Sequence, residues 1–86
     1  MLRPYWITLR RRIEPSPLNL GVGITADSEI DARNLFMERI GGEERILEIK
    51  LIENMGVLDE NHVVPNMGNP LLRGIWFPLG YDSPLK

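Results

Sequence analysis

His62 is the residue best suited to acid–base chemistry, because it is the one histidine in a chain of 86 residues and imidazole titrates near neutral pH. Asp59 and Glu60 precede it closely, so a carboxylate could orient the ring of a general base. No serine nucleophile motif and no glycine-rich oxyanion loop accompanies this group in the sequence. Because acid–base catalysis needs several mutually placed groups, we expect no catalytic residue and interpret His62 as part of a turn.

Acidic residues alternate at Asp27, Glu29 and Asp31, a spacing that resembles the start of a calcium-binding loop. The glycine and the closing glutamate of such a loop are missing, and one histidine with scattered carboxylates gives no zinc-site spacing. The chain has no cysteine, which excludes disulfides and thiolate metal sites. The sequence therefore predicts no metal and no cofactor, and these acidic residues indicate the first turn of a helix.

Phosphate binding is suggested by the cationic cluster at residues 10–12, but alternate arginines on a strand face opposite sides. Gly21-Val22-Gly23 lacks the third glycine and the lysine of phosphate-binding loops. The formal net charge is −2, whereas nucleic-acid binding usually shows as a basic excess. We therefore expect neither nucleotide nor nucleic-acid binding.

The composition is that of an ordinary folded protein, with 43% hydrophobic and 26% charged residues. Residues 1–86 leave no room for a second domain, so we expect a single domain. The N-terminal residues lack the apolar run of a secretion signal, and no stretch is long and apolar enough to span a membrane. Together with the missing cysteines, these features favour a cytoplasmic protein without membrane contact.

Three segments have the patterns of β-strands. Residues 5–13 alternate, and residues 20–26 form a shorter second strand in which Gly21 and Gly23 leave space for a close neighbour. A hairpin is the simplest pairing of these two strands. In the third strand, residues 45–54, we predict one apolar face of Leu47, Ile49 and Leu51, with Ile46 and Ile52 making the opposite face less than fully polar.

A helix is predicted between the capping residues Asp27 or Ser28 and the Gly41-Gly42 stop. At 100° per residue, its polar side contains Asp31, Asn34 and Glu38. Its broad apolar side is expected to contain Ile30, Ala32, Leu35, Phe36, Met37 and Ile40.

Residues 62–81 are rich in apolar side chains, proline and glycine, which makes regular secondary structure hard to sustain. We expect this segment to cover the second face of the sheet, with residues 74–77 adding an edge strand. Trp76 and Phe77 are adjacent, so extended backbone would turn one inward and the other outward. The alternative is that Trp6, Arg73 and Trp76 all pack internally. The predicted fold class is α+β: a small antiparallel sheet of three to four strands, one helix on one face, and a long irregular C-terminal segment on the other.

The end of the chain carries a string formed by Pro65-Asn66-Met67-Gly68 and, further on, Arg73-Gly74-Ile75-Trp76-Phe77-Pro78 and Gly80-Tyr81. With Thr25-Ala26-Asp27 at the helix start, it resembles small bacterial single-domain proteins that end in the same pattern. Such proteins look like the immunity proteins that accompany contact-dependent or polymorphic toxins. The resemblance implies a non-catalytic module that binds and neutralises a cognate toxin, and an acidic excess can complement a basic nuclease toxin.

A protein partner would contact exposed acidic, aromatic and arginine side chains, since aromatics and arginine are frequent at binding hot spots. The predicted partner-binding residues are Asp31, Glu38, Asp59, Glu60, His62, Arg73 and Trp76, with Trp6 as a further aromatic to test. Two alternatives stay open: a small enzyme or ligand-binding protein that uses His62 and Arg73 on an anionic substrate, and a homodimer closed by residues 62–81.

Overall fold

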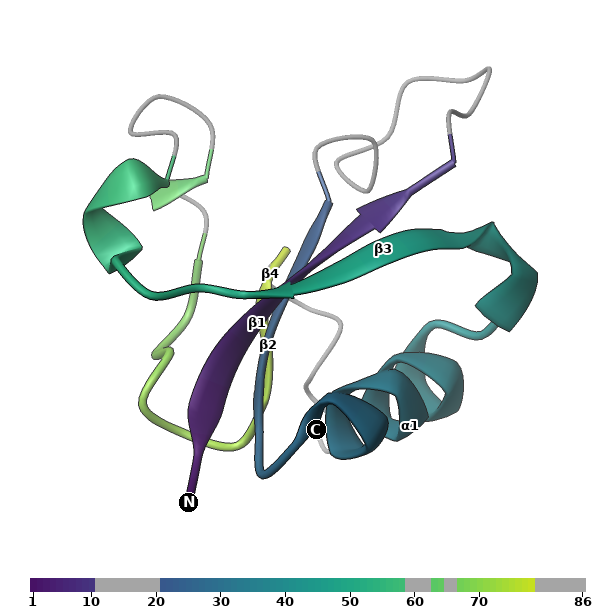
Figure 1. The fold of residues 1–86 in the computed structure, drawn as a ribbon, viewed down its shortest axis with the longest axis horizontal. Coiled ribbons are helices and arrows are strands. Elements are labelled where there is room, and N and C mark those ends of the chain that lie inside the picture. The colour runs from purple at the N-terminus through teal and green to yellow at the C-terminus, as the bar shows by residue number, and fades with distance from the viewer. Residues whose placement is uncertain (11–20, 59–62, 65–66, 79–86) are drawn as a thin grey trace.

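The fold was analysed in a computed structural model that describes residues 1–10, 21–58, 63–64 and 67–78. Four strands form one antiparallel sheet in the order β3-β1-β2-β4, and one α-helix packs against it (Figure 1). The elements are β1 (Arg3–Leu9), β2 (Val22–Ala26), α1 (Glu29–Arg39), β3 (Ile46–Leu51) and β4 (Gly74–Phe77), with short 3-10 helices at Glu43–Arg45 and Met55–Val57. The predicted α+β class is confirmed.

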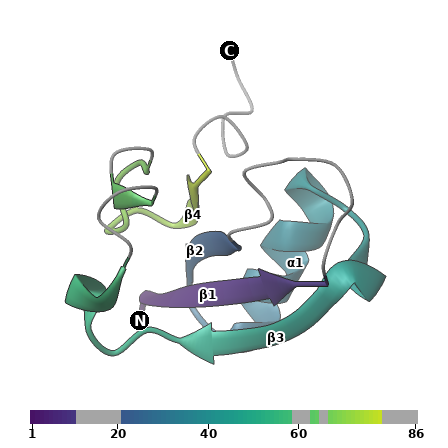
Figure 2. The ribbon, with the colours of Figure 1, turned by 90° about the horizontal axis from the view of Figure 1, so that it is seen from above.

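The predicted hairpin between the first two strands is present, and β1 lies at the centre of the sheet between β2 and β3 (Figure 2). In the β1–β2 pair, Arg3 lies opposite Ala26 and Ile7 lies opposite Val22. Residues 11–13 of the expected first strand and residue 20 of the expected second strand lie outside the described residues.

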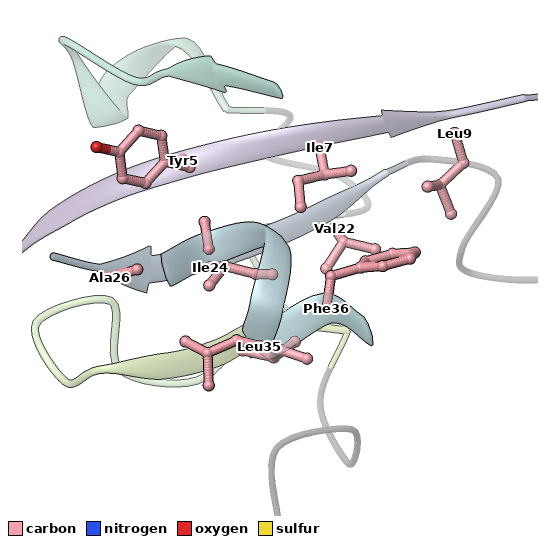
Figure 3. Close-up of a cluster of buried hydrophobic side chains, with 10 residues drawn as sticks. Tyr5, Ile7, Leu9, Val22, Ile24, Ala26, Leu35 and Phe36 are labelled. Atoms are coloured by element: carbon pink, nitrogen blue, oxygen red, sulfur yellow. The ribbon is translucent and has the colours of Figure 1, made fainter. Parts of the chain in front are cut away.

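One face of the sheet packs against α1, and this layer forms the larger core (Figure 3). Alternation along β1 directs Tyr5, Ile7 and Leu9 toward the helix, as the sequence pattern predicts. The buried members of this core are Tyr5, Ile7, Leu9, Val22, Ile24, Ala26, Ala32, Leu35, Phe36 and Ile75.

Both ends of α1 follow the predicted capping. The Ser28 hydroxyl accepts a hydrogen bond from the Asp31 backbone N–H at 3.1 Å, which satisfies one of the free donors of the first turn. After the last turn, Gly41 and Gly42 have φ values of 83° and 79°, a region that glycine enters without steric penalty. The Gly41 N–H bonds back to the Phe36 carbonyl at 3.0 Å and closes the helix.

The helix buries a narrower face than predicted. Ile30 is 71% exposed and Met37 is 43% exposed, so the expectation that both join the apolar side was wrong. At 100° per residue, Ile30 lies about 200° away from Ala32, and Met37 lies almost in line with Ile30 two turns later. These two side chains therefore share the solvent side of α1, opposite Ala32 and Phe36.

The opposite face of the sheet carries a second, smaller core that contains part of the segment 62–81. Val63, Trp76 and Phe77 are its buried members. Trp6 lies 6.2 Å from Trp76 and 5.7 Å from Phe77 between ring centroids. The partly buried side chains packed against it are Trp6, Ile52, Met55, Leu58 and Met67.

Gly21 and Gly23 provide the space for these two indole rings. A Cβ atom built on Gly21 would lie 2.4 Å from the Trp6 ring, and one built on Gly23 would lie 2.5 Å from the Trp76 ring. Gly21 also has a φ of 119°, which other residues rarely adopt. The prediction that both glycines admit a close neighbour is confirmed.

Trp76 and Phe77 do not face opposite sides of the sheet, so that prediction was wrong. In the β2–β4 pair, Ile24 lies opposite Ile75 whereas Gly23 lies opposite Phe77, which leaves Trp76 as an extra residue in β4. Such a bulge breaks the strict alternation of a strand. Both aromatic side chains consequently enter the second core.

A similar irregularity changes the expected apolar face of β3. Ile49 and Leu51 pack against the helix-side core as predicted, but Leu47 is 59% exposed. The register of β3 on β1 shifts so that Leu9 lies opposite Ile46. Ile46 therefore takes the core position that the sequence pattern assigned to Leu47.

We predict that Gly23→Ala destabilises the protein by about 1–3 kcal/mol, because the added methyl group must displace the Trp76 ring. The free energy of unfolding from urea titrations measures the effect. Gly56→Ala is the control, because its nearest neighbour would be the exposed Asn54 side chain at 3.1 Å. Equal losses in the two variants would contradict the close packing of Trp76 on β2.

Candidate functional site

Asp31 and Arg73, two of the predicted partner-binding residues, form a bidentate ion pair in the folded chain. The Arg73 Nη2 donates to Asp31 Oδ1 at 2.6 Å, and the Arg73 Nε donates to Asp31 Oδ2 at 3.0 Å. Asp31 belongs to the first turn of α1, and Arg73 directly precedes β4. The ion pair therefore connects the loop of residues 67–73, which precedes β4, to the first turn of α1, 42 positions earlier in the sequence.

The hydrogen bonds on Asp31 favour its charged form. Arg73 contributes most, and the backbone N–H of Asp27 adds a bond to Asp31 Oδ2 at 3.0 Å. Together they lower the pKa of Asp31 from its ordinary 3.8 to about 2. The same pairing raises the pKa of Arg73, with weaker contributions from the negative charges of Asp27 and Glu38.

Large exposed apolar side chains adjoin both members of this ion pair in the sequence. Ile30 adjoins Asp31 on the helix, and Leu71 and Leu72, which are 79% and 64% exposed, precede Arg73 in the loop. Met37 lies on the same side of α1 as Ile30, and Glu38 lies two turns after Asp31. We name these residues the α1–Arg73 surface, and its members are Ile30, Asp31, Met37, Glu38, Leu71, Leu72 and Arg73.

The loop before β4 has its own local structure. The Asn69 side chain accepts a hydrogen bond from the Leu71 N–H at 2.9 Å, and the Asn69 carbonyl accepts one from the Leu72 N–H at 3.3 Å. Asparagine commonly forms such turns because its side chain reaches the backbone two residues later. This turn presents Leu71 and Leu72 to solvent.

A buried hydroxyl group attaches this loop to the sheet. Thr25, which is buried in β2, donates through Oγ1 to the Pro70 carbonyl at 2.5 Å. The Trp76 Nε1 donates to the same Thr25 oxygen at 3.0 Å. Gly68 adds a backbone bond from its N–H to the Trp76 carbonyl at 2.6 Å. The position of the loop thus depends on the second core.

The structure brings together three of the seven predicted partner-binding residues, Asp31, Glu38 and Arg73. The prediction that Trp76 contacts a partner was wrong. Its ring lies on Gly23 within the second core, and the residue is only 2% exposed. Asp59, Glu60 and His62 lie outside the described residues.

Sequence reasoning missed four apolar members of the α1–Arg73 surface. Ile30 and Met37 were assigned to the buried side of the helix, and Leu71 and Leu72 were treated as covering for the sheet. One signal was available: Ile30 and Met37 are seven residues apart and therefore share a helix face that excludes Ala32 and Phe36.

Within the described residues, no group of three or more histidine, cysteine, aspartate or glutamate side chains is arranged to hold a metal ion. No helix among those residues is long and apolar enough to cross a membrane. Comparisons of the chain with known protein families, with curated proteins and with solved structures find no match.

We predict that Thr25→Val destabilises the protein by about 2–4 kcal/mol, because it removes the hydroxyl partner of the buried Trp76 N–H and of the part-buried Pro70 carbonyl. Thr25→Ser is the matched control, since it keeps the hydroxyl group and loses only a methyl group. Urea unfolding of both variants tests this. A valine variant as stable as the serine variant would contradict the role of the hydroxyl.

The ion pair predicts a specific dependence of stability on pH. The pKa of Asp31 is lower in the folded chain than its ordinary value, so its contribution is complete above pH 4 and is lost as the pH falls toward 2. The difference in unfolding free energy between wild type and Arg73→Gln should therefore shrink over this interval. Arg3→Gln, on an exposed strand residue, is the control. A difference that stays constant from neutral pH to pH 2.5 would refute the pairing.

Proposed function

We propose that this protein is a non-catalytic protein-binding module that contacts its partner through the α1–Arg73 surface. The observation that carries the proposal is the exposure of Ile30, Leu71 and Leu72, which adjoin the two members of a bidentate ion pair in the sequence. Large apolar side chains that are exposed beside charged residues are typical of a protein interaction site.

The arrangement of the surface also favours recognition of a protein. The apolar side chains come from a helix and from a loop that is hydrogen-bonded to a buried threonine. A surface fixed in this way loses little conformational entropy when a partner docks. Arg73 is bonded to Asp31 at both its Nε and its Nη2, which favours a positioning role for this arginine over capture of an anionic substrate.

The most concrete partner is a bacterial toxin domain, which makes the protein a cytoplasmic immunity protein. The resemblance of the C-terminal string to such proteins motivates this choice. The charge of the chain agrees with it, since a net charge of −2 and the acidic residues Glu29 and Glu38 near the surface would attract a basic nuclease domain. An inhibitor of this kind needs a fixed surface and no chemistry of its own.

The proposal is tested with the C-terminal domain of a toxin encoded immediately upstream of this gene. We expect the purified domain to bind the protein, and its growth inhibition to be relieved when the two are co-expressed. Ile30→Glu and Leu72→Glu should each weaken binding by at least about tenfold, because each places a charge among apolar contacts. Isothermal titration calorimetry gives the affinities.

Val64→Glu is the matched control, because Val64 is also an exposed apolar residue but belongs neither to the α1–Arg73 surface nor to a strand of the sheet. Its affinity for the toxin domain should equal that of the wild type. The proposal fails if the toxin domain does not bind at about 10 μM, or if Ile30→Glu and Leu72→Glu bind as tightly as the control.

A further inference from the structure

The outer edge of β3 has no neighbouring strand among the described residues, because β3 ends the order β3-β1-β2-β4 (Figure 2). Exposed sheet edges are templates for pairing with another strand. This edge lies apart from the α1–Arg73 surface, so what it binds is a separate question from the proposed function.

The hydrogen bonds to β1 show which backbone groups of β3 point outward. The Ile52 N–H donates to the Pro4 carbonyl at 2.9 Å, and the register continues with Trp6 opposite Lys50 and Thr8 opposite Glu48. In an antiparallel pair, residues that bond to the neighbour alternate with residues whose N–H and C=O groups point away from it. The backbone groups of Ile49 and Leu51 therefore point away from β1, toward the outer edge.

The side chains along this edge are self-complementary about a two-fold axis. If two copies of β3 pair antiparallel with Ile49 opposite Ile49 of the second copy, Glu48 lies opposite Lys50 of that copy and Lys50 lies opposite its Glu48. Glu48 and Lys50 are exposed in the single chain. The same register places the exposed Leu47 opposite Leu51 of the second copy.

This register also agrees with the backbone geometry. The N–H and C=O groups of Ile49 in each copy form two hydrogen bonds with those of Ile49 in the other copy. The neighbouring pairs, Glu48 opposite Lys50 on either side of the axis, are therefore non-hydrogen-bonded pairs. Side chains approach more closely in such pairs, and opposite charges there stabilise a sheet. Moving the two-fold axis to residue 48 or to residue 50 removes the two charge pairs and places Glu48 opposite Glu48, or Lys50 opposite Lys50, of the second copy.

Two features of the edge oppose indiscriminate pairing. Lysine on an edge strand and an irregular register both discourage contact with other strands, and β3 has Lys50 and a register shift between Glu48 and Ile46. The shift lies at the N-terminal end of the strand and leaves residues 48–51 regular. Between two antiparallel copies of β3, Lys50 lies opposite an acidic residue only in the register centred on Ile49. The charge pattern of the edge therefore favours a second copy of the same strand in that register.

We propose that two copies of this chain associate through antiparallel pairing of their β3 strands about a two-fold axis at Ile49, which joins their sheets into one. The interface is small, so its dissociation constant should lie in the micromolar range. Sedimentation equilibrium of the wild type over about 5–500 μM should show a reversible monomer–dimer equilibrium.

Charge variants at the two exposed positions test the register. In Glu48→Lys, lysine meets lysine in both pairs, and in Lys50→Glu, glutamate meets glutamate. Each variant should weaken dimerisation by about tenfold or more, and the doubly exchanged Glu48→Lys/Lys50→Glu should recover the wild-type constant. Circular dichroism confirms that all three are folded, since both residues are exposed.

Mixing the two single variants gives the most specific result. Their copies should form a heterodimer in preference to either homodimer, because every pair then has opposite charges, and native mass spectrometry separates the three species. General attraction does not produce this result, because the net charges are 0 (−2 + 2) and −4 (−2 − 2) and are therefore not opposite in sign.

The proposal is overturned if the wild type is monomeric up to about 500 μM. It is also overturned if the single variants dimerise as well as the wild type, or if their mixture gives no excess of heterodimer. The toxin-binding measurements of the Ile30 and Leu72 variants report on a different surface, so failure of that function leaves these outcomes unaffected.

Discussion

The close contact of two tryptophan rings with Gly21, just before β2, and Gly23, within β2, is the constraint on which the rest of this structure depends. Only a residue without a side chain fits at Gly23, because a Cβ atom there would lie 2.5 Å from the Trp76 ring. The contact allows the second face of the sheet to be covered by Trp76 and Phe77. In a chain of 86 residues, burying both sheet faces provides much of the available hydrophobic stabilisation.

The same contact determines where the candidate site lies. With its ring on β2, Trp76 donates its indole N–H to Thr25, and the Thr25 hydroxyl in turn donates to the Pro70 carbonyl. The loop is thereby held on both sides of Leu71 and Leu72, and Arg73 is brought within hydrogen-bonding distance of Asp31. A buried interaction thus fixes the position of an exposed surface.

The sequence predicts the layers of this fold because each depends on a local pattern. The alternation of apolar and polar residues predicts β1 and most of β3. Ser28 and the Gly41-Gly42 pair predict the two ends of α1. The errors at Leu47 and Trp76 share one cause, since both residues are located where the strand register shifts. A bulge depends on the partner strand, so the periodicity of a single strand does not contain it. For the site, the sequence predicts Asp31, Glu38 and Arg73 as partner-binding residues, but it does not predict that Arg73 pairs with Asp31, because that pairing is a tertiary contact.

The central claim is that the Thr25 hydroxyl group holds the loop of the α1–Arg73 surface in place. Amide hydrogen exchange, measured by NMR in wild type and Thr25→Val, tests it most directly. We predict that the Gly68 amide exchanges much faster in the variant, because its hydrogen bond to the Trp76 carbonyl opens once the loop is released. The Ile40 amide at the end of α1 should keep its protection. Unchanged exchange at Gly68 would contradict the account.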